Sequence, residues 1–175
     1  MSHEQLPPTL SPAVLYEREA EYVWNSLRRL GVPASDLEDL THETFVLAFR
    51  KLTTFDPSRP VRPWLFGIAA RIAGHHRRAF LRRREEGGEL PEVEFAGPGP
   101  HEALDESRRR ALLLRALSAV KLDRRAVLIL HEIDGLAVPE VARALGIRLN
   151  TAYSRLRVGR IELADALRRL AGGER

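Results

Sequence analysis

Side chains that can donate hydrogen bonds or carry positive charge are frequent in the residues that follow a short turn near the C-terminal end of the sequence. Residues 138–157 read Val-Pro-Glu-Val-Ala-Arg-Ala-Leu-Gly-Ile-Arg-Leu-Asn-Thr-Ala-Tyr-Ser-Arg-Leu-Arg. An arginine guanidinium can donate two hydrogen bonds to the edge of a guanine, and hydroxyl groups reach phosphates. The segment therefore predicts a surface that reads duplex DNA in the major groove. Its candidate side chains are Arg148, Asn150, Thr151, Tyr153, Ser154, Arg155 and Arg157.

Two short helices must hold this surface in place. Pro139 suits the first turn of a helix, where no N–H partner is lost, and Gly146 can close that helix with a left-handed turn. Asn150 or Thr151 is expected to cap the second helix, with Ala152 and Leu156 facing inward. This spacing indicates a helix-turn-helix, although a plain helical hairpin on a surface would show the same spacing.

A second candidate site combines aromatic and basic residues in segment 55–84. Phe55, Trp64 and Phe66 flank a loop that holds three prolines in seven residues, and an arginine-rich helix follows. Basic grooves with aromatic walls bind single-stranded nucleic acid and unstacked bases. The alternative is that Trp64 and Phe66 are core residues beside a basic helix.

An acidic face precedes that loop, on a helix expected to begin at Ser35 or Asp36 and to end near Leu52. Its apolar side runs from Leu37 to Ala48. A basic protein partner would explain the acidic face better than nucleic acid would, and a solvated surface is the other interpretation. The polar side chains of this face are Asp36, Asp39, His42 and Glu43.

Composition narrows the class of protein. The 175 residues are 44% hydrophobic and 30% charged, with a net charge of +4 and no cysteine. No stretch approaches the roughly 18–20 apolar residues of a membrane span, and residues 1–8 do not resemble a signal peptide. We expect a cytoplasmic protein with no membrane insertion. The sequence contains no recognisable metal-binding pattern, phosphate-binding loop or catalytic triad. We therefore expect that the protein is not an enzyme and binds neither a metal nor a cofactor.

Charge divides the chain into a basic part, an acidic part and a second basic part at residues 143–169. Residues 57–84 contain eight arginines and no acid, whereas residues 85–107 contain eight acids and no Lys or Arg. Glycine–proline punctuation within the acidic part predicts a flexible linker. No period-two alternation is present, so the fold class is predicted to be all-α: helices at 11–30, 36–52, 63–84, 102–120, 126–132 and 138–157. We expect two small helical domains, 11–85 and 102–172, joined by an acidic linker at 86–101.

The two modules together resemble a known family. Segments 36–45 (Asp-Leu-Glu-Asp-Leu-Thr-His-Glu-Thr-Phe), 55–57 (Phe-Asp-Pro) and 64–69 (Trp-Leu-Phe-Gly-Ile-Ala) resemble region 2 of bacterial sigma factors. Segments 130–136, 140–142, 145–147 and 151–156 resemble region 4. Two such modules with only a linker between them are similar to the extracytoplasmic-function group of the sigma-70 family.

The resemblance implies an alternative sigma factor, which binds core RNA polymerase and directs promoter recognition, promoter melting and transcription initiation. It implies that Asp36, Asp39, His42 and Glu43 dock on the clamp helices of the largest polymerase subunit, and that region 4 packs on the flap. The helix with Thr151 to Arg157 would read the minus-thirty-five element, and an anti-sigma factor is a further possible partner. The implied minus-ten contacts are Phe55, Asp56, Ser58, Arg59, Arg62, Trp64, Arg71, Arg77 and Arg78.

Two other functions fit the sequence less completely. One is a helix-turn-helix repressor or activator that is no polymerase subunit, with residues 11–84 as an effector or dimerisation module. The other is a helical adaptor that occupies a partner of a true sigma factor. A separate hypothesis is that the acidic linker covers the basic faces in the free protein.

Overall fold

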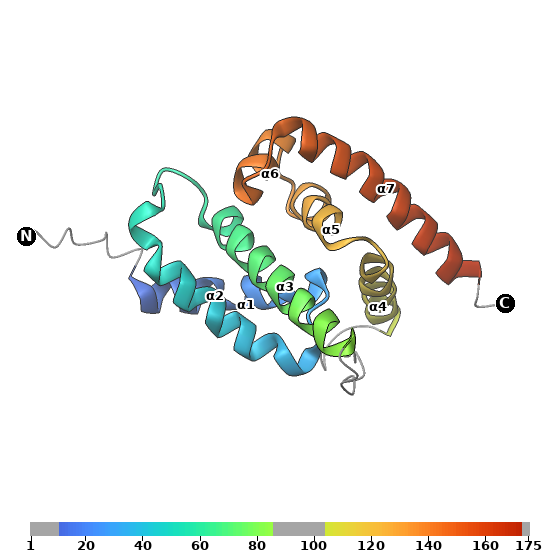
Figure 1. Cartoon of the computed structure of the whole chain (residues 1–175), viewed down its shortest axis with the longest axis horizontal. Helices are drawn as coiled ribbons and strands as arrows, with labels where there is room; N and C mark the ends of the chain where they lie inside the picture. The colour runs from blue at the N-terminus through green and yellow to red at the C-terminus, as the bar shows by residue number, and fades with distance from the viewer. Residues whose placement is uncertain (1–10, 86–103, 173–175) are drawn as a thin grey trace, which may run out of the picture.

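Helices make up the regular structure in the computed structural model, which describes residues 11–85 and 104–172 (Figure 1). Within these residues no strand is present, which confirms the predicted all-α class. The α-helices are α1 (Pro12–Leu30), α2 (Leu37–Arg50), α3 (Val61–Glu85), α4 (Leu104–Ser118), α5 (Leu122–Leu128), α6 (Val138–Leu145) and α7 (Leu149–Gly172).

Helices α1, α2 and α3 pack on one another and form what we call the N-terminal module. The predicted start of α1 is confirmed: the Ser11 hydroxyl accepts a hydrogen bond from the backbone N–H of Val14 at 3.4 Å. At its other end Gly31 adopts a left-handed conformation with φ +88°, which favours glycine and terminates the helix. The module is built around the fully buried side chains of Leu27, Phe45, Leu65 and Phe66.

Helices α4 to α7 form the C-terminal module, in which the long α7 contacts α4, α5 and α6. Apolar side chains of Val127, Leu130 and Leu156 are buried between them. Gly159 lies where α7 crosses α5, and a Cβ there would come within 3.2 Å of the Leu128 side chain. A side chain at position 159 would require Leu128 to shift, so glycine favours the close approach of the two helices.

Several predicted boundaries were wrong. A 3₁₀ turn at Ala34–Asp36 precedes α2; Asp36 holds the N-cap position, as predicted, but its side chain makes no capping hydrogen bond. Helix α3 begins at Val61, before Pro63, because a proline is tolerated in the first helical turn. The short helix expected at 126–132 starts earlier, at Leu122, and continues into a π-helical turn at Ile129–Ile133. The predicted linker at 86–101 lies outside the described residues.

The two modules are in contact, as Figure 1 shows for α3 and the helices beside it. Helix α3 packs on α6, and α1 packs on α4 and α5. Arg125 of α5 is 3% exposed and joins the modules: its Nη1 donates to the Leu30 carbonyl oxygen at 2.7 Å. The modules thus share buried polar contacts as well as apolar surface.

No helix in the described ranges is long and apolar enough to cross a membrane.

Candidate functional site

The proline-rich loop carries an aromatic pair. The rings of Phe55 and Trp64 lie 4.9 Å apart between centroids and are tilted by 44°. Both side chains are half-buried, whereas Phe66 is completely buried in the core. Of the three aromatic residues considered for the site, Phe66 is therefore a core residue, and Phe55 and Trp64 are the two that reach the surface.

Hydrogen bonds around Asp56 shape the tip of this loop. Its carboxylate accepts from the Ser58 hydroxyl at 2.6 Å and from the Ser58 backbone N–H at 3.1 Å, and it pairs with Arg59 at 2.9 Å. The two bonds from Ser58, followed by the Arg59 charge, hold the pKa of Asp56 below its usual value. Because these side chains are exposed, the pair contributes little stability but presents the loop in one conformation.

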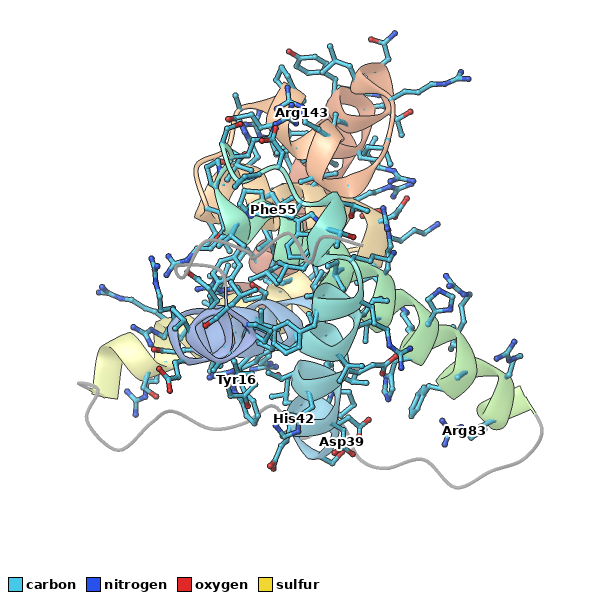
Figure 2. The ribbon with its side chains drawn as sticks, turned by 90° about the vertical axis from the view of Figure 1, so that its left-hand side faces the viewer. Tyr16, Asp39, His42, Phe55, Arg83 and Arg143 are labelled. Atoms are coloured by element: carbon cyan, nitrogen blue, oxygen red, sulfur yellow. The ribbon has the colours of Figure 1, made fainter. Side chains whose placement is uncertain are left out.

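A cleft of about 1020 Å³ opens beside the aromatic pair and is shared by the two modules. The N-terminal module supplies the wall that carries Phe55 and Trp64, and the C-terminal module supplies the opposite wall. In Figure 2 Phe55 lies between the two modules, below Arg143 of α6. Cationic side chains outnumber acids around it: Arg29, Lys51, Arg59, Arg62, Arg71 and Arg143 against Asp56, Asp134 and Glu140.

One side of the cleft is organised by Tyr22, which sequence reasoning missed. Its hydroxyl donates to the Asp134 carboxylate at 2.6 Å, and Arg29 lies 3.9 Å from the same carboxylate. Burial, followed by the bond to Asp134, raises the pKa of Tyr22 far above its usual value of 10. The phenol therefore stays protonated and acts as a hydrogen-bond donor.

Arg62 lies over the Tyr22 ring, with its guanidinium carbon 5.1 Å from the ring centroid. Its Nε donates to the buried Glu19 carboxylate at 2.7 Å, and this bond is the main reason that its pKa is raised. Arg62 is thus fixed at the cleft, while more than half of its side chain remains exposed to a ligand.

The α3 arginines do not all reach this cleft. Arg71 lines it, whereas Arg77 and Arg78 point into a separate groove of about 610 Å³ between α3 and the C-terminal module. That groove also contains Arg155 of α7. Of the nine predicted minus-ten residues, the structure places Phe55, Asp56, Arg59, Arg62, Trp64 and Arg71 around one cleft. Ser58 adjoins it through Asp56.

The helix-turn-helix is formed by α6 and α7. Gly146 has φ +64° and ends α6 as predicted, and the Ile147 backbone N–H donates to the Ala142 carbonyl oxygen at 2.9 Å. The predicted cap at Asn150 or Thr151 was wrong, because α7 already begins at Leu149. Ala152 and Leu156 are buried, as expected.

The face of α7 opposite these two residues is open. Tyr153 is 52% exposed, and Arg148, Asn150, Ser154 and Arg157 are exposed as well. Thr151 and Arg155 are half-buried, and the Arg155 Nε is paired with Asp123 at 3.2 Å. Five of the seven predicted duplex-reading side chains are therefore free to reach a groove, and Arg155 must first leave its carboxylate partner.

The acidic face of α2 lies at the other end of the molecule, where Figure 2 labels Asp39 and His42 far from Arg143. Asp39, His42 and Glu43 are exposed, and His42 accepts or donates a hydrogen bond with the Tyr16 hydroxyl at 3.1 Å. Asp36 differs from the other three, since its carboxylate lies 2.7 Å from Nε2 of His76 on α3. It is held inside the N-terminal module.

Tyr22, Arg29, Asp134 and Arg143 are the site residues that the sequence did not indicate. Tyr22 and Arg29 lie on α1, Arg143 lies on α6 and Asp134 lies in the turn before α6, so no single sequence spacing links the three segments. No group of three or more His, Cys, Asp or Glu that could hold a metal ion occurs among residues 11–85 and 104–172.

Family models match both modules. Sigma-70 region 2 matches residues 15–84, and Sigma-70 region 4 matches residues 110–163. The RNA polymerase sigma factor CnrH of Cupriavidus metallidurans is 30% identical over 161 residues, covering 87% of this chain and 84% of CnrH. The ECF RNA polymerase sigma factor SigE of Mycolicibacterium smegmatis is 32% identical over 155 residues, covering 87% of this chain and 60% of SigE.

Solved structures agree in fold. CnrH in complex with the cytosolic domain of CnrY superposes with a TM-score of 0.59 at 27% identity, covering 89% of this chain and 86% of CnrH. Bartonella quintana RpoE, solved with the anti-sigma factor NepR, has a TM-score of 0.64 at 24% identity, with 87% and 96% covered. The chain belongs to the extracytoplasmic-function group of the sigma-70 family, and it directs RNA polymerase in promoter recognition and transcription initiation.

Proposed function

We propose that the two modules divide the work of promoter recognition. The N-terminal module, residues 11–85, binds core polymerase and opens the minus-ten element, and the C-terminal module, residues 102–172, reads the minus-thirty-five element. The observation that carries this proposal is the presence in one chain of an aromatic, arginine-lined cleft and of an open helix face behind a helix-turn-helix.

A protein that captures a displaced DNA strand must offset the free energy that is lost when bases leave the duplex stack. Taking a base out of a duplex costs a few kcal/mol, and stacking on an aromatic side chain returns about 1–3 kcal/mol per base. Phe55 and Trp64 supply the aromatic surface, and Arg59, Arg62 and Arg71 lie where they can bind the phosphates of that strand. In this arrangement Asp56 and Ser58 shape the loop, since their bonds are made to each other.

In this proposal the N-terminal half of α7 contacts the bases of the minus-thirty-five duplex. Arg157, Ser154 and Tyr153 project from its exposed side, and the buried Ala152 and Leu156 fix the rotation of the helix. Arg148 and Asn150 lie at the start of this helix, where side chains of a recognition helix meet base edges and phosphates.

Arg157→Ala should reduce transcription from the cognate promoter by about tenfold or more, because one arginine–base contact contributes about 1–3 kcal/mol of discrimination. Arg169→Ala is the matched control: Arg169 is also exposed on α7 but lies about three turns further along, and its replacement should leave transcription unchanged. Run-off transcription with saturating core polymerase measures both variants. Equal activities would remove Arg157 from the duplex-reading surface.

The acidic face of α2 is the proposed contact with the clamp helices of the largest polymerase subunit. Asp39, His42 and Glu43 carry it, while Asp36 contributes by anchoring α2 to α3 through His76. The C-terminal module would contact the polymerase flap. Because polymerase acts there, we place the protein in the cytoplasm.

An anti-sigma factor is a further proposed partner. CnrH was solved with the cytosolic domain of CnrY, and the superposition on that structure covers 89% of the present chain.

Reversing the charge of the acidic face tests the polymerase contact. Asp39→Lys with Glu43→Lys should weaken binding to purified core polymerase more than about tenfold, because like charges placed across an interface cost several kcal/mol. Glu17→Lys with Glu21→Lys makes the same change of net charge on exposed positions of α1 and should bind normally. Fluorescence titration of core enzyme gives both affinities. A wild-type chain that does not bind core would overturn the proposed function.

A further inference from the structure

The exposed side of α7 carries two large apolar side chains near the start of the helix, which we call the apolar pair. Leu149, the first residue of α7, is 43% exposed, and Tyr153, one turn later, is 52% exposed. Residues four apart lie on the same face of a helix. A single exposed apolar side chain is ordinary on a protein surface, whereas neighbouring ones on a proposed recognition helix indicate a contact site.

The core of the C-terminal module does not depend on the apolar pair. Ala152 and Leu156 are buried and attach this part of α7 to the core. Because Leu149 and Tyr153 are each exposed over two-fifths or more of their surface, their packing within the chain contributes little. Truncating either side chain should therefore leave α7 folded and in place.

The residues around the apolar pair favour nucleic acid as the partner. Residues 141–161 contain five arginines and no Asp or Glu. Arg148, Asn150 and Ser154 are exposed next to the pair and can donate hydrogen bonds. A helix face of this charge is complementary to the phosphates of a duplex.

The major groove of DNA offers one apolar group to such a surface. Every base pair presents hydrogen-bond donors or acceptors there, but only thymine adds a methyl group, at C5. The side chain of Leu149 has neither donor nor acceptor, so contact with a thymine methyl is the base-specific contact open to it. The ring edge of Tyr153 can make the same contact.

The spacing of the apolar pair fits two thymines. Four residues rise about 6 Å along a helix, and stacked bases are about 3.4 Å apart. A recognition helix contacts base edges with its N-terminal residues. Leu149 and Tyr153 lie in that part of α7, so they face positions about two base pairs apart. Ile161 is also exposed, but it lies about 18 Å beyond Leu149 along the helix.

We propose that Leu149 and Tyr153 are specificity-determining residues, which contact the 5-methyl groups of two thymines about two base pairs apart in the minus-thirty-five element. The exposed arginines and amides of α7 read hydrogen-bonding groups, and the apolar pair selects A·T pairs at the positions that it faces. This proposal rests on the assignment of the N-terminal half of α7 to the minus-thirty-five duplex.

Deoxyuridine tests the methyl contacts, because it lacks the 5-methyl group of thymidine and pairs with adenine in the same way. The probe is the linear cognate promoter in which the minus-thirty-five thymines of both strands are replaced one at a time. Each probe competes with the unmodified promoter for holoenzyme reconstituted from the full chain and core polymerase. Loss of one methyl contact should weaken binding about fourfold at two positions. Deoxyuridine between the two promoter elements is the DNA control and should change nothing.

Side-chain variants assign each methyl contact to a residue. Leu149→Ala should abolish the response to deoxyuridine at one position, and Tyr153→Ala should abolish it at the other. Tyr153→Phe keeps the ring and should retain both responses. Ile161→Ala is the matched control, because it shortens an exposed apolar side chain on the same helix, and it should also retain both. Circular dichroism at 222 nm checks that the variants are folded.

Each outcome decides the proposal. Two responsive positions, each lost in one alanine variant, support it. It is overturned if fewer than two minus-thirty-five positions respond to deoxyuridine, or if both alanine variants keep the full response. In the second case, weaker binding of the variants to core polymerase would make the apolar pair a protein-binding surface.

The proposed function has a separate readout. Duplex reading by α7 fails if Arg157→Ala transcribes as well as the wild-type chain. The methyl contacts fail if deoxyuridine has no effect on a promoter from which Arg157→Ala transcribes poorly. The two failures are therefore distinguishable.

Discussion

Arg125→Ala is expected to lower the free energy of unfolding by about 3 kcal/mol, because several buried carbonyl oxygens lose their donor together. Arg125 Nη2 donates to Ser118 at 2.7 Å and to Val120 at 2.8 Å, and Nη1 donates to Leu30 at 2.7 Å. Leu30 ends α1 and Ser118 ends α4. Unpaired carbonyl groups at helix C-termini carry partial negative charge, so one guanidinium stabilises two helix ends.

The guanidinium of Arg125 donates its hydrogen bonds to the backbone carbonyl oxygens of Leu30, Ser118 and Val120. Burial is the main reason that its pKa falls to about 10, and the charge of Arg77 lowers it further. The desolvation cost is offset by hydrogen bonds to carbonyl dipoles. Gly31 makes room for these hydrogen bonds, because a Cβ at this position would overlap the Arg125 guanidinium.

Chemical denaturation followed by circular dichroism at 222 nm measures the effect. Arg125→Met keeps much of the volume and still orphans the carbonyl oxygens, so it should be nearly as destabilising as Arg125→Ala. Arg124→Ala is the neighbouring control: Arg124 forms a half-exposed ion pair with Glu162, and its loss should cost less than about 1 kcal/mol. Equal losses for Arg124→Ala and Arg125→Ala would refute this account of Arg125.

Local patterns in the sequence predicted the helices and their ends well, but they predicted the contacts between helices poorly. The cap at Ser11, the turn at Gly146 and the inward faces of Ala152 and Leu156 follow from rules that act within one or two helical turns, and all were confirmed. A local signal failed where neighbouring structure competed with it. At Asp36 the boundary was right but the bond was not: the residue holds the N-cap position of α2, while its carboxylate pairs with His76 of α3.

The three aromatic residues could not be sorted into buried and surface positions by local sequence patterns. Phe55, Trp64 and Phe66 look alike in sequence, yet Phe66 is fully buried and the other two line the cleft. The rotation of α3 against α1 and α2 separates Trp64 from Phe66, whereas Phe55 lies in the loop before α3. A helical period places Leu65 and Ile68 inward but does not say how wide the buried stripe is.

The contacts between the two modules could not be predicted from the sequence. Arg125 follows another arginine, Arg124, and nothing local indicates that one is buried and the other half-exposed. The pairing of Tyr22 with Asp134 joins residues more than a hundred positions apart. Such contacts depend on how two separately folded surfaces fit, which composition and periodicity do not encode.

The other large effect is expected at the cleft. Trp64→Ala should reduce transcription from a linear duplex promoter about 10- to 100-fold, because stacking of one base on an aromatic side chain contributes about 1–3 kcal/mol. Trp64 is the larger ring of the pair with Phe55 and begins the buried part of α3, so it is held rigidly at the edge of the cleft. Trp64→Phe keeps an aromatic face and should retain most of the activity.

A template that is already open separates strand capture from the other steps. On a promoter with a mismatched, pre-opened minus-ten region the unstacking cost has been removed, so Trp64→Ala should regain most of its activity. Core binding should be unchanged, since the acidic face of α2 lies away from Phe55 and the cleft (Figure 2). Recovery on the open template would also show that the variant is folded. A loss of the same size on both templates would instead mean that Trp64 acts through the packing of α3, as a core residue, and the cleft would lose its aromatic role in melting.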